Sequence, residues 1–317
     1  MVAMEKKRGV AVIAVVVMAG CALATLLSFL GRFWWGFDLF ANFHLQYAAV
    51  LAAVAVCFAV IRQRMLLVGS LLLLVPHLVC LSYYYPWKGA VETDGEPLLE
   101  VIAFNVLTSN LRHDEVLGYL QKEDPDVLLL VEVNQGWLEA LAPLERTHPH
   151  FRQLPRADNF GMALYSRFPI RAHDTVALSS ELPCMATLID WDGRLISVIG
   201  AHPLPPIGGI RAMLRDQYLK QLGELAKVAG EGGDVVLLGD LNTTPWSHGF
   251  RELLESGGLL DSARRRGFQS SWKRLNPVFS LPLDHILHSP GLECVERRIG
   301  PDLGSDHRPV GASFHCR

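Results

Sequence analysis

Three long apolar runs near the N-terminus constrain this chain more than any other feature of its sequence. Residues 10–30 carry no charged side chain, and a helix of that length crosses the ~30 Å hydrocarbon layer of a bilayer. Two further runs cover residues 44–61 and 65–85, and the last contains Pro76 and His77, where we expect a kink. The sequence therefore predicts a membrane anchor over residues 1–88 with three transmembrane helices.

The basic residues around these runs predict an orientation. Lys6–Arg8 precede the first run, and Arg62 and Arg64 lie in the short turn between the second and third. Short loops rich in Lys and Arg stay on the cytoplasmic side of a membrane. Aromatic residues gather instead at 31–43 and 83–87, as they do at a membrane interface. We therefore expect a multi-pass protein of the cell membrane whose C-terminal domain is extracytoplasmic.

Two alternatives to this anchor stay open in the sequence. A basic start followed by an apolar run is also typical of a cleaved signal peptide, and residues 18–21 resemble a lipoprotein cleavage box ending at Cys21. The apolar run continues for nine residues past Cys21, which favours an uncleaved helix. The other alternative is the helical core of a soluble domain, and the lack of a polar face on these segments disfavours it.

Charge distinguishes the rest of the chain from the anchor. Residues 1–89 hold seven Lys or Arg and two acids, whereas residues 90–317 hold 22 basic and 30 acidic residues, a net charge of −8. A protein that binds duplex DNA without sequence preference usually presents a basic face. Nucleic acid is therefore the less favoured partner, and the sequence points to no protein partner.

Residues 89–97 are short and polar, so we interpret them as a linker that leads into a domain over residues 98–317. Short apolar runs separated by turn residues predict strands in this domain, and amphipathic or polar segments predict helices. The expected strands cover 98–107, 126–133, 162–166, 184–190, 194–200, 235–239, 283–288 and 310–314, and the expected helices cover 113–122 and 209–229. This pattern predicts an α+β class with sheets at the centre.

Polar residues follow or begin several of the predicted strands. The residues in question are Asn105, Glu132, His202, Asp240, Asn242, Asp284, His285 and the run Ser305–Pro309. Catalytic groups are commonly placed at strand ends, where a rigid scaffold holds the loops. Acids and amides within such apolar surroundings are otherwise costly unless they are paired. Their positions therefore indicate catalytic groups placed at the ends of strands.

The residue types at these positions suit metal-assisted hydrolysis of a phosphate ester. Mg²⁺ binds hard oxygen ligands and keeps several waters, so one or two carboxylates suffice, and Mn²⁺ accepts the same ligands. An acid within hydrogen-bond reach can deprotonate the attacking water, and imidazole or amide donors can stabilise the charge that develops on phosphoryl oxygens. The six cysteines have no CxxC-type spacing and predict no zinc site; whether any of them are oxidised is left open.

The motifs around these residues resemble those of the endonuclease/exonuclease/phosphatase superfamily, which includes DNase I. They occur in order as FNV, VEVN, AHPLPP, GDLNTTPWS, LDHIL and GSDHRPV, from Asn105 to Pro309. Each motif is weak alone, but six in order, each beside an apolar strand, make a specific pattern. The resemblance implies a DNase I-like fold, which is a four-layered α/β sandwich of two packed sheets flanked by helices.

The resemblance also implies a metal site and a group that activates water. Glu132 would be the principal metal ligand, with Asn105 beside it and Asp306 contributing to the same or a second metal site. Asp240 would orient or deprotonate the attacking water. Asn242 would hold that water and a phosphate oxygen.

The remaining implied roles concern the phosphate. His307 would bind the scissile phosphate and stabilise the transition state, and Asp284 would fix the tautomer of His307. His202 would contact a phosphate oxygen. Asn159 and Gly161 match the family's strand that faces the active site, so Asn159 would contribute to substrate binding.

Two other features have simpler interpretations. His285 alternates with Asp284 to the other side of the same strand, so we expect it to pack in the core or behind the site. The run Arg264–Arg266 would suit nucleic acid, but a solvated face or a contact with lipid headgroups is the favoured interpretation.

The family resemblance predicts a reaction and leaves the substrate open. The favoured hypothesis is a membrane-anchored phosphatase acting on a lipid-linked substrate, because the linker between anchor and domain is short. Three N-terminal spans followed by such a domain also resemble the VanJ-like teicoplanin-resistance proteins, which suggests a polyprenyl pyrophosphate. The alternatives are an extracytoplasmic metal-dependent endonuclease or exonuclease, and a non-catalytic binding module held at the membrane.

Overall fold

The computed structural model describes residues 2–86, 97–273 and 279–317. The chain divides into two compact units. The N-terminal unit comprises Met1–Tyr85 with Trp246–His248, and the C-terminal unit comprises Pro86–Pro245 and Gly249–Arg317. The expected linker over residues 89–97 lies outside the described residues except for residue 97.

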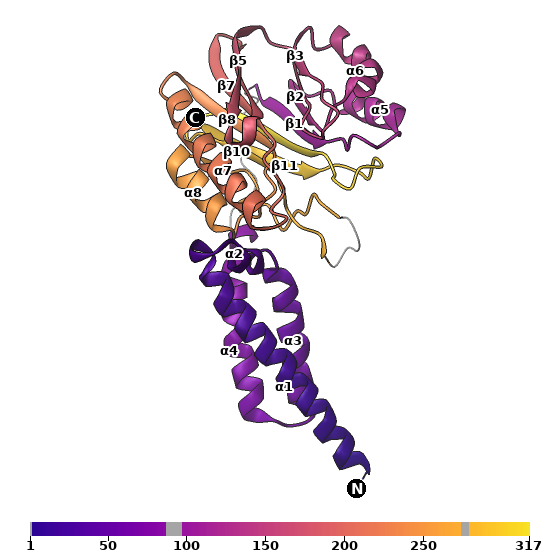
Figure 1. The fold of residues 1–317 in the computed structure, drawn as a ribbon, viewed down its shortest axis with the longest axis vertical. Coiled ribbons are helices and arrows are strands. Elements are labelled where there is room, and N and C mark those ends of the chain that lie inside the picture. Colours follow the sequence, from indigo (N-terminus) through magenta and orange to yellow (C-terminus); the bar gives the residue numbers. More distant parts are fainter. Residues whose placement is uncertain (1, 87–96, 274–278) are drawn as a thin grey trace. The chain divides into compact units, whose positions relative to one another are not determined.

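The N-terminal unit is helical, as its composition predicts (Figure 1). Its elements are α1 (Val2–Phe29), η1 (Gly31–Phe33), α2 (Trp35–Ala41), α3 (His44–Val60), α4 (Arg64–Leu81) and η2 (Ser82–Tyr84). Two helical segments, Glu5–Phe29 and Arg64–Tyr84, are long and apolar enough to cross a membrane. The predicted middle span coincides with α3, which qualifies only when it is joined to α2 across a 60° bend. Length and composition thus support two candidate spans, or three with the bent pair.

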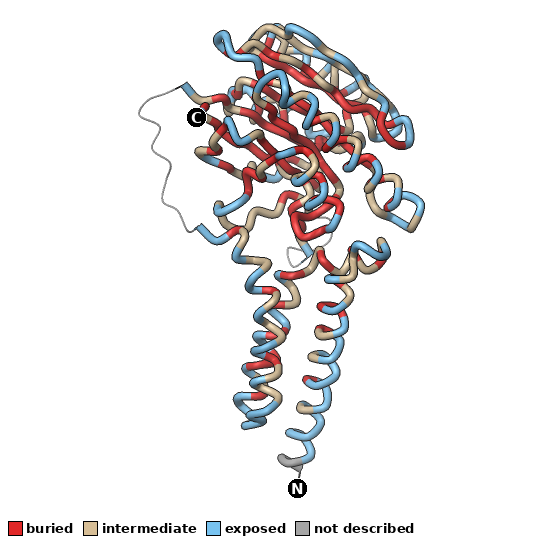
Figure 2. Tube along the Cα trace, turned by 90° about the vertical axis from the view of Figure 1, so that its left-hand side faces the viewer, coloured by how far each residue is buried: buried red, intermediate tan, exposed pale blue. Residues whose placement is uncertain are grey.

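Large apolar side chains lie exposed along these helices, and the polar ones pair inside the unit. Ile13 and Leu72 are 67% and 66% exposed, and Figure 2 shows the same mixture of exposed and buried positions along each helix. The hydroxyl of Thr25 lies 2.9 Å from Nε2 of His77, and Nδ1 of His77 lies 2.8 Å from Nδ1 of His44. Hydrogen bonds of this kind join helices where no water is available to satisfy polar groups.

Two six-stranded sheets form the C-terminal unit (Figure 1). The first has the order β11 (Leu292–Ile299), β12 (Val310–Cys316), β1 (Leu99–Asn105), β2 (Val127–Val131), β4 (Met162–Ser166), β3 (His150–Leu154). The second has the order β5 (Ile170–Leu178), β6 (Leu182–Trp191), β7 (Arg194–Ala201), β8 (Asp234–Asp240), β10 (Asp284–His288), β9 (Leu260–Asp261). Each sheet has one central parallel pair, β1 with β2 and β7 with β8, and its other pairs are antiparallel.

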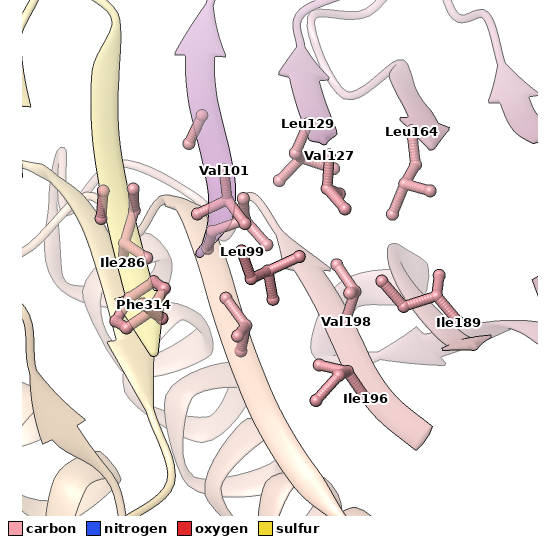
Figure 3. Packing of buried hydrophobic residues seen from close by; sticks show 14 of the residues in the cluster. Leu99, Val101, Val127, Leu129, Leu164, Ile189, Ile196, Val198, Ile286 and Phe314 are labelled. Carbon is pink, nitrogen blue, oxygen red and sulfur yellow. The ribbon is translucent and has the colours of Figure 1, made fainter. Parts of the chain in front are cut away.

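The two sheets pack face to face over one apolar core. Val101 and Leu129 of the first sheet and Val198 and Ile286 of the second belong to one buried cluster, and Figure 3 shows these side chains meeting. Gly200 allows the close approach, because a Cβ there would lie 2.5 Å from a methyl group of Leu129. The branched residues that predicted the central strands therefore fill the space between the sheets.

Helices cover the outer face of each sheet. The first sheet is covered by α5 (His113–Glu123) and α6 (Gln135–Leu141), followed by η3 (Ala142–Arg146). Near the second sheet lie α7 (Gly209–Gly230) and α8 (His248–Gly257). The short helix η4 (Ser179–Glu181) joins β5 to β6. One buried cluster joins α5 and α6 to the first sheet through Leu120 and Trp137, and another joins α7 to the second sheet through Leu222. The side chain of Asn134 caps α6 by accepting a 2.9 Å hydrogen bond from the amide of Trp137. The fold is DNase I-like in its two mixed sheets with flanking helices.

Every predicted strand and helix of this unit is present, with ends shifted by up to two residues. The sequence did not predict β3, β5, β9, β11, α6 or α8. β5 and β11 are edge strands in which polar residues outnumber buried apolar ones, as in IRAHDTVAL for β5. Edge strands bury little of either face, so their sequences lack the continuous apolar run on which the prediction relied.

Candidate active site

The strand-end residues singled out in the sequence come together at one edge of the two sheets. Asn105 ends β1, and Asp240 ends β8. Glu132 follows β2, which runs parallel to β1, and His202 follows β7, which runs parallel to β8. The carboxyl ends of parallel strands meet at the same edge of a sheet, so the connectivity brings Asn105 near Glu132 and His202 near Asp240. Packing of the two sheets then joins the pairs, since Nδ2 of Asn105 lies 3.1 Å from Oδ2 of Asp240.

The antiparallel neighbours bring two more residues to the same edge. Asp284 begins β10 and lies opposite Asp240 in the β8–β10 ladder. His307 lies three residues before β12, whose first residue, Val310, pairs with Ala103 near the end of β1. Asp284, Asp240 and His307 are each 5% exposed or less, so these three side chains are buried at the strand ends.

A single amide joins the carboxylates of the two sheets. Nδ2 of Asn105 donates to Oε1 of Glu132 at 2.9 Å and to Oδ2 of Asp240 at 3.1 Å. Oδ1 of Asn105 accepts from the amide of Leu107 at 3.1 Å. The amide nitrogen of Asn105 therefore links Glu132 to Asp240. To act as a metal ligand, Asn105 would have to turn its amide oxygen toward Glu132.

Glu132 is held by its backbone as well as by Asn105. Its φ of 64° lies in the left-handed region, which residues other than glycine rarely adopt. The hydroxyl of Thr108 donates to the carbonyl of Glu132 at 2.9 Å, and the amide of Thr108 lies 3.4 Å from Oε2. Such strain collects at functional sites, where the surrounding contacts over-determine it. Thr108 had no signal in the sequence, because it lies in a loop with no motif.

Asp240 lies between two histidines. Its Oδ2 is 3.5 Å from Nε2 of His202 and 3.5 Å from Nε2 of His307, and its Oδ1 accepts from the amide of Asn242 at 3.0 Å. Burial alone would raise the pKa of Asp240, but the positive charge of His307 and the contact with His202 outweigh it and hold the pKa well below the usual carboxyl value. Asp240 is therefore an anion at neutral pH and can accept a proton or a hydrogen bond.

His307 is paired with Asp284 through the other ring nitrogen. Nδ1 of His307 lies 2.7 Å from Oδ2 of Asp284. Burial alone would lower the pKa of His307, but the carboxylates of Asp284 and Asp240 outweigh burial and raise it to about 10. Asp284 thus does more than select a tautomer, because it keeps His307 as an imidazolium, a cation suited to a phosphoryl oxygen.

Asn242 and His202 complete the side of the site that belongs to the second sheet. Asn242 has a φ of 49°, and its Nδ2 donates to the carbonyl of Pro203 at 3.0 Å, which ties its loop to the one after His202. The guanidinium of Arg215, 2% exposed, donates to the carbonyl of Asn242 at 3.1 Å. Nδ1 of His202 is buried and makes no hydrogen bond within the described residues.

Asp306 is oriented by a tryptophan that the sequence analysis missed. Nε1 of Trp272 donates to Oδ2 of Asp306 at 3.1 Å, and Trp272 forms isolated bridges with Leu281 and His307. The segment around Trp272 has no apolar run and no family motif, so nothing in its sequence indicated this role. Asp306 is partly exposed, unlike its neighbour His307.

Asn159 lies on an exposed loop between β3 and β4, and within the described residues its side chain makes no hydrogen bond or ion pair with the cluster. Its neighbour Phe160 does reach it, because the ring of Phe160 packs 5.3 Å from that of His202. Gly161 lets this loop approach, since a Cβ there would lie 1.8 Å from the carbonyl oxygen of Val133. The structure therefore brings the 159–161 segment to the site through Phe160, and the substrate role of Asn159 stays a prediction.

His285 has the contacts of a core side chain. It is 1% exposed, its Nε2 lies 3.0 Å from the carbonyl of Thr243, and its ring packs 4.4 Å from that of Phe250. These contacts agree with the expectation that His285 packs behind the site.

Three groups of the cluster lie close enough to hold a metal ion. One ligand atom from each of Asp240, Asp284 and His307 lies within 4.8 Å of the other two. The donor set is carboxylate and imidazole, and Oδ1 of Asp284 is buried without a hydrogen bond within the described residues. As long as Asp284 keeps His307 protonated, however, the His307 ring donates and does not ligate. The carboxylate of Glu132 is the alternative ligand, with the oxygen chemistry that Mg²⁺ prefers.

Comparison with known proteins decides the family. The sequence profile of the endonuclease/exonuclease/phosphatase family matches residues 102–307. The chain belongs to this family. It is accordingly a metal-dependent phosphoesterase, which sets aside the alternative of a non-catalytic binding module. None of the curated protein sequences is significantly similar to it.

Solved structures of the family share the fold at low sequence identity. A family member from Bacteroides vulgatus is 16% identical with a TM-score of 0.60, and the match covers 70% of this chain and all of that one. Humanized Danio rerio TDP2 is 17% identical with a TM-score of 0.59, covering 69% and 99% of the two chains. The human Nocturnin catalytic domain, crystallised with sulfate, is 19% identical with a TM-score of 0.59, covering 74% and 100%.

Proposed function

We propose that this phosphoesterase hydrolyses a lipid-linked phosphate ester or pyrophosphate at a membrane surface, with a polyprenyl pyrophosphate as the fitting substrate class. One observation carries the proposal. Three large apolar side chains lie exposed on the segment that begins at His202: Ile207 is 69% exposed, Ile210 is 75% exposed and Met213 is 59% exposed. Exposed apolar groups that cluster beside a site are typical of surfaces that bind lipid or apolar ligands.

This apolar segment is tied to the site at both ends. Asn242 donates to the carbonyl of Pro203 at one end, and Arg215 of α7 donates to the carbonyl of Asn242 at the other. Ile210 and Met213 are three residues apart on α7 and therefore share one face of the helix. An isoprenoid chain lying on this face would leave its phosphate near His202.

The N-terminal unit and the charge of the chain support the same conclusion. The apolar helices of that unit are long enough to keep the enzyme at a membrane, and the −8 net charge of residues 90–317 disfavours nonspecific binding of duplex DNA. Placement of the domain on the extracytoplasmic side follows from the basic loops and belongs to this proposal. So does assignment to a VanJ-like subgroup.

The geometry supports a division of labour within the site. Asp240, an anion held by the amide of Asn242, accepts a proton from the attacking water, which Asn242 helps to position. His307, kept cationic by Asp284, binds the scissile phosphate and stabilises the charge that develops on it. His202 donates to a second phosphoryl oxygen, and Asn159 contributes a contact at the rim.

Glu132 is the proposed principal metal ligand, with Asp306 contributing and Asn105 turning its amide oxygen inward. A bound Mg²⁺ or Mn²⁺ would act as a Lewis acid on the phosphoryl oxygens. The strained backbone of Glu132 and the hydrogen bond from Trp272 to Asp306 hold these two carboxylates in position, so the carboxylates need little reorganisation when the ion binds.

The substrate is tested with the detergent-solubilised full-length chain and Mg²⁺. Polyprenyl pyrophosphate and plasmid DNA are supplied in parallel, and His307→Ala is the blank. We expect phosphate release from the lipid and intact plasmid. Nicking of the plasmid without hydrolysis of the lipid would contradict the proposal.

A triple variant tests the apolar segment itself. Ile207→Ser, Ile210→Ser and Met213→Gln together should raise KM for the lipid substrate at least ~10-fold, because burial of large apolar side chains contributes much of the affinity. Hydrolysis of the soluble p-nitrophenyl phosphate should not change. Val228→Ser is the matched control, since Val228 is 65% exposed on the same helix, about 27 Å from Ile210. An unchanged KM in the triple variant would remove the observation that carries the proposal.

An extracytoplasmic nuclease is the alternative within the family. Danio rerio TDP2, a structural relative 17% identical, was crystallised with a single-stranded DNA product. The site residues described above would serve a phosphodiester of DNA equally well, so the two functions differ in the surface around the site. The parallel assay with plasmid DNA separates them.

A further inference from the structure

The second sheet carries a basic hollow at the end opposite the active site. The hollow measures about 240 Å³, and its lining includes the side chains of Ser262, Arg264, Arg265, Arg266 and Arg317. Asp284 and His288 are the first and last residues of β10, and His288 also lines the hollow. They lie four positions apart along the strand, or about 13 Å. The hollow is therefore a place distinct from the catalytic cluster.

Charge in the hollow differs in sign from that of the domain around it. Four arginine side chains line it, against the two acids Asp261 and Glu293. This local excess of two positive charges stands within a segment, residues 90–317, whose net charge is −8. Concentrated guanidinium groups in a concave site are typical of binding to phosphate and carboxylate.

The acids in the hollow are already engaged by the protein. Oδ1 of Asp261 accepts from the amide of Ala263 at 2.9 Å, and Oε2 of Glu293 lies 3.3 Å from Nε of Arg317. The guanidinium of Arg266 donates to the carbonyl of Cys294. Arg264 and Arg265 line the hollow and are exposed to solvent, where an anion can approach them.

Three further residues that line the hollow, Ser262, His288 and Cys294, are uncharged. Ser262 is 1% exposed, and its hydroxyl oxygen makes no hydrogen bond within the described residues. Burial raises the pKa of the Cys294 thiol to about 11, and burial lowers the pKa of His288. Neither group therefore adds a charge at neutral pH. A buried hydroxyl without a partner is costly unless something satisfies it.

We propose that this hollow, lined by Arg264, Arg265 and Arg266 together with Ser262, is a second anion site that binds a phosphate group. The group is either inorganic phosphate or the phosphate of an anionic lipid headgroup, since both present the same oxygens. Strands β10 and β12 run directly from the catalytic cluster to this hollow, because Asp284 and His288 share one strand and Arg317 follows the other. The inference does not depend on the proposed substrate.

Phosphate binding is measured by calorimetry on the detergent-solubilised full-length chain. His307→Ala without divalent metal is the starting protein, so that the catalytic site contributes little. It should bind inorganic phosphate saturably, and adding Arg264→Gln with Arg265→Gln should weaken binding at least ~10-fold, as expected for two lost charged hydrogen bonds. Adding Arg146→Gln with Arg194→Gln instead is the matched control, since both arginines are exposed and lie outside the hollow. Equal binding by all three proteins, or no saturable binding by any, would overturn the proposal.

A second arm distinguishes the source of the phosphate. The same chains are reconstituted in phosphatidylcholine vesicles with phosphatidylglycerol, extracted, and examined by native mass spectrometry. Less retained phosphatidylglycerol on the Arg264→Gln, Arg265→Gln chain than on the control assigns a headgroup ligand. Equal retention, together with the loss of phosphate binding, assigns free phosphate. In the active chain, which keeps His307, Arg264→Gln with Arg265→Gln should leave the hydrolysis of p-nitrophenyl phosphate unchanged, because neither residue belongs to the catalytic cluster.

Discussion

At the scale of single residues, the site depends on hydrogen bonds that cross from one sheet to the other. Asn105 joins Glu132 of the first sheet to Asp240 of the second, and Asp284 joins the second sheet to His307. Each acid thus has a defined partner, which lowers the cost of burying it. The charge of His307 in turn depends on the carboxylates beside it.

Asp284→Asn should therefore lower kcat by roughly 10²–10³-fold, the usual cost of losing one donor to a developing oxyanion. Without the Asp284 carboxylate, the pKa of His307 falls from its raised value of about 10 and less imidazolium is present. Steady-state hydrolysis of p-nitrophenyl phosphate measures this, with Asp174→Asn, an exposed acid of β5, as control. A variant as active as the control would show that Asp284 does not act through His307.

His148 gives the C-terminal unit a pH-dependent stability. It is 1% exposed, and burial lowers its pKa below 6.5 although the carbonyl of Pro125 accepts from its ring at 2.6 Å. Below about pH 6.5 the unfolded chain binds a proton that the folded chain does not, so the free energy of unfolding falls as the pH drops through the folded pKa. Urea denaturation of the full chain followed by tryptophan fluorescence should show this, and His148→Gln should flatten the dependence. An unchanged slope in the variant would contradict it.

At the scale of elements, the central strands were predictable and the edges were not. The run VLLLV of β2 is buried throughout. A continuous apolar run predicts an interior strand or an interior helix segment, and its short length favours a strand. In β3, HFRQL contains no fully buried residue, so no periodicity revealed it. The same difference holds for the site. Residues at the ends of central strands were predicted from the sequence. Four others lie on loops or on a helix without a motif and were not predicted: Thr108, Phe160, Arg215 and Trp272.

Gly239 shows how closely the elements around the site must pack. A Cβ there would lie 2.0 Å from the carbonyl oxygen of Ala201, and its φ is 143°. Gly239→Ala should cost about 2–4 kcal/mol of unfolding free energy, because it adds both backbone strain and a clash between β7 and β8. Gly118→Ala is the control, since a Cβ there meets nothing within 4 Å in α5, and it should stabilise by about 0.5–1 kcal/mol. If urea denaturation showed the same change in unfolding free energy for Gly239→Ala and Gly118→Ala, the close packing of β7 against β8 would not be required for stability.

At the scale of the whole molecule, the sequence predicts a membrane protein more clearly than it predicts a substrate. The apolar helices follow from length and composition, and the family follows from six motifs in order. In the proposed function, substrate choice depends on exposed side chains such as Ile210, which no periodicity distinguishes from ordinary surface residues. The orientation likewise depends on where basic loops lie, and needs its own test.

Orientation is measured by labelling intact cells with a membrane-impermeant thiol reagent. Arg146→Cys, on an exposed turn of the C-terminal unit, should be labelled in intact cells. Lys7→Cys, in the basic stretch at the start of α1, should be labelled only after the cells are permeabilised, because short basic segments stay in the cytoplasm. The reverse pattern would place the catalytic unit in the cytoplasm.

We attribute hydrolysis of phosphate esters with a divalent metal to the cluster around Asp240 and His307. Hydrolysis of bis(p-nitrophenyl) phosphate is measured for the full-length chain with Mg²⁺, with excess EDTA, and for Asp240→Asn. We expect activity with Mg²⁺, its loss in EDTA, and roughly 10³-fold slower turnover in Asp240→Asn with an unchanged unfolding transition. Hydrolysis that persists in EDTA, or a near-normal rate in Asp240→Asn, would contradict it.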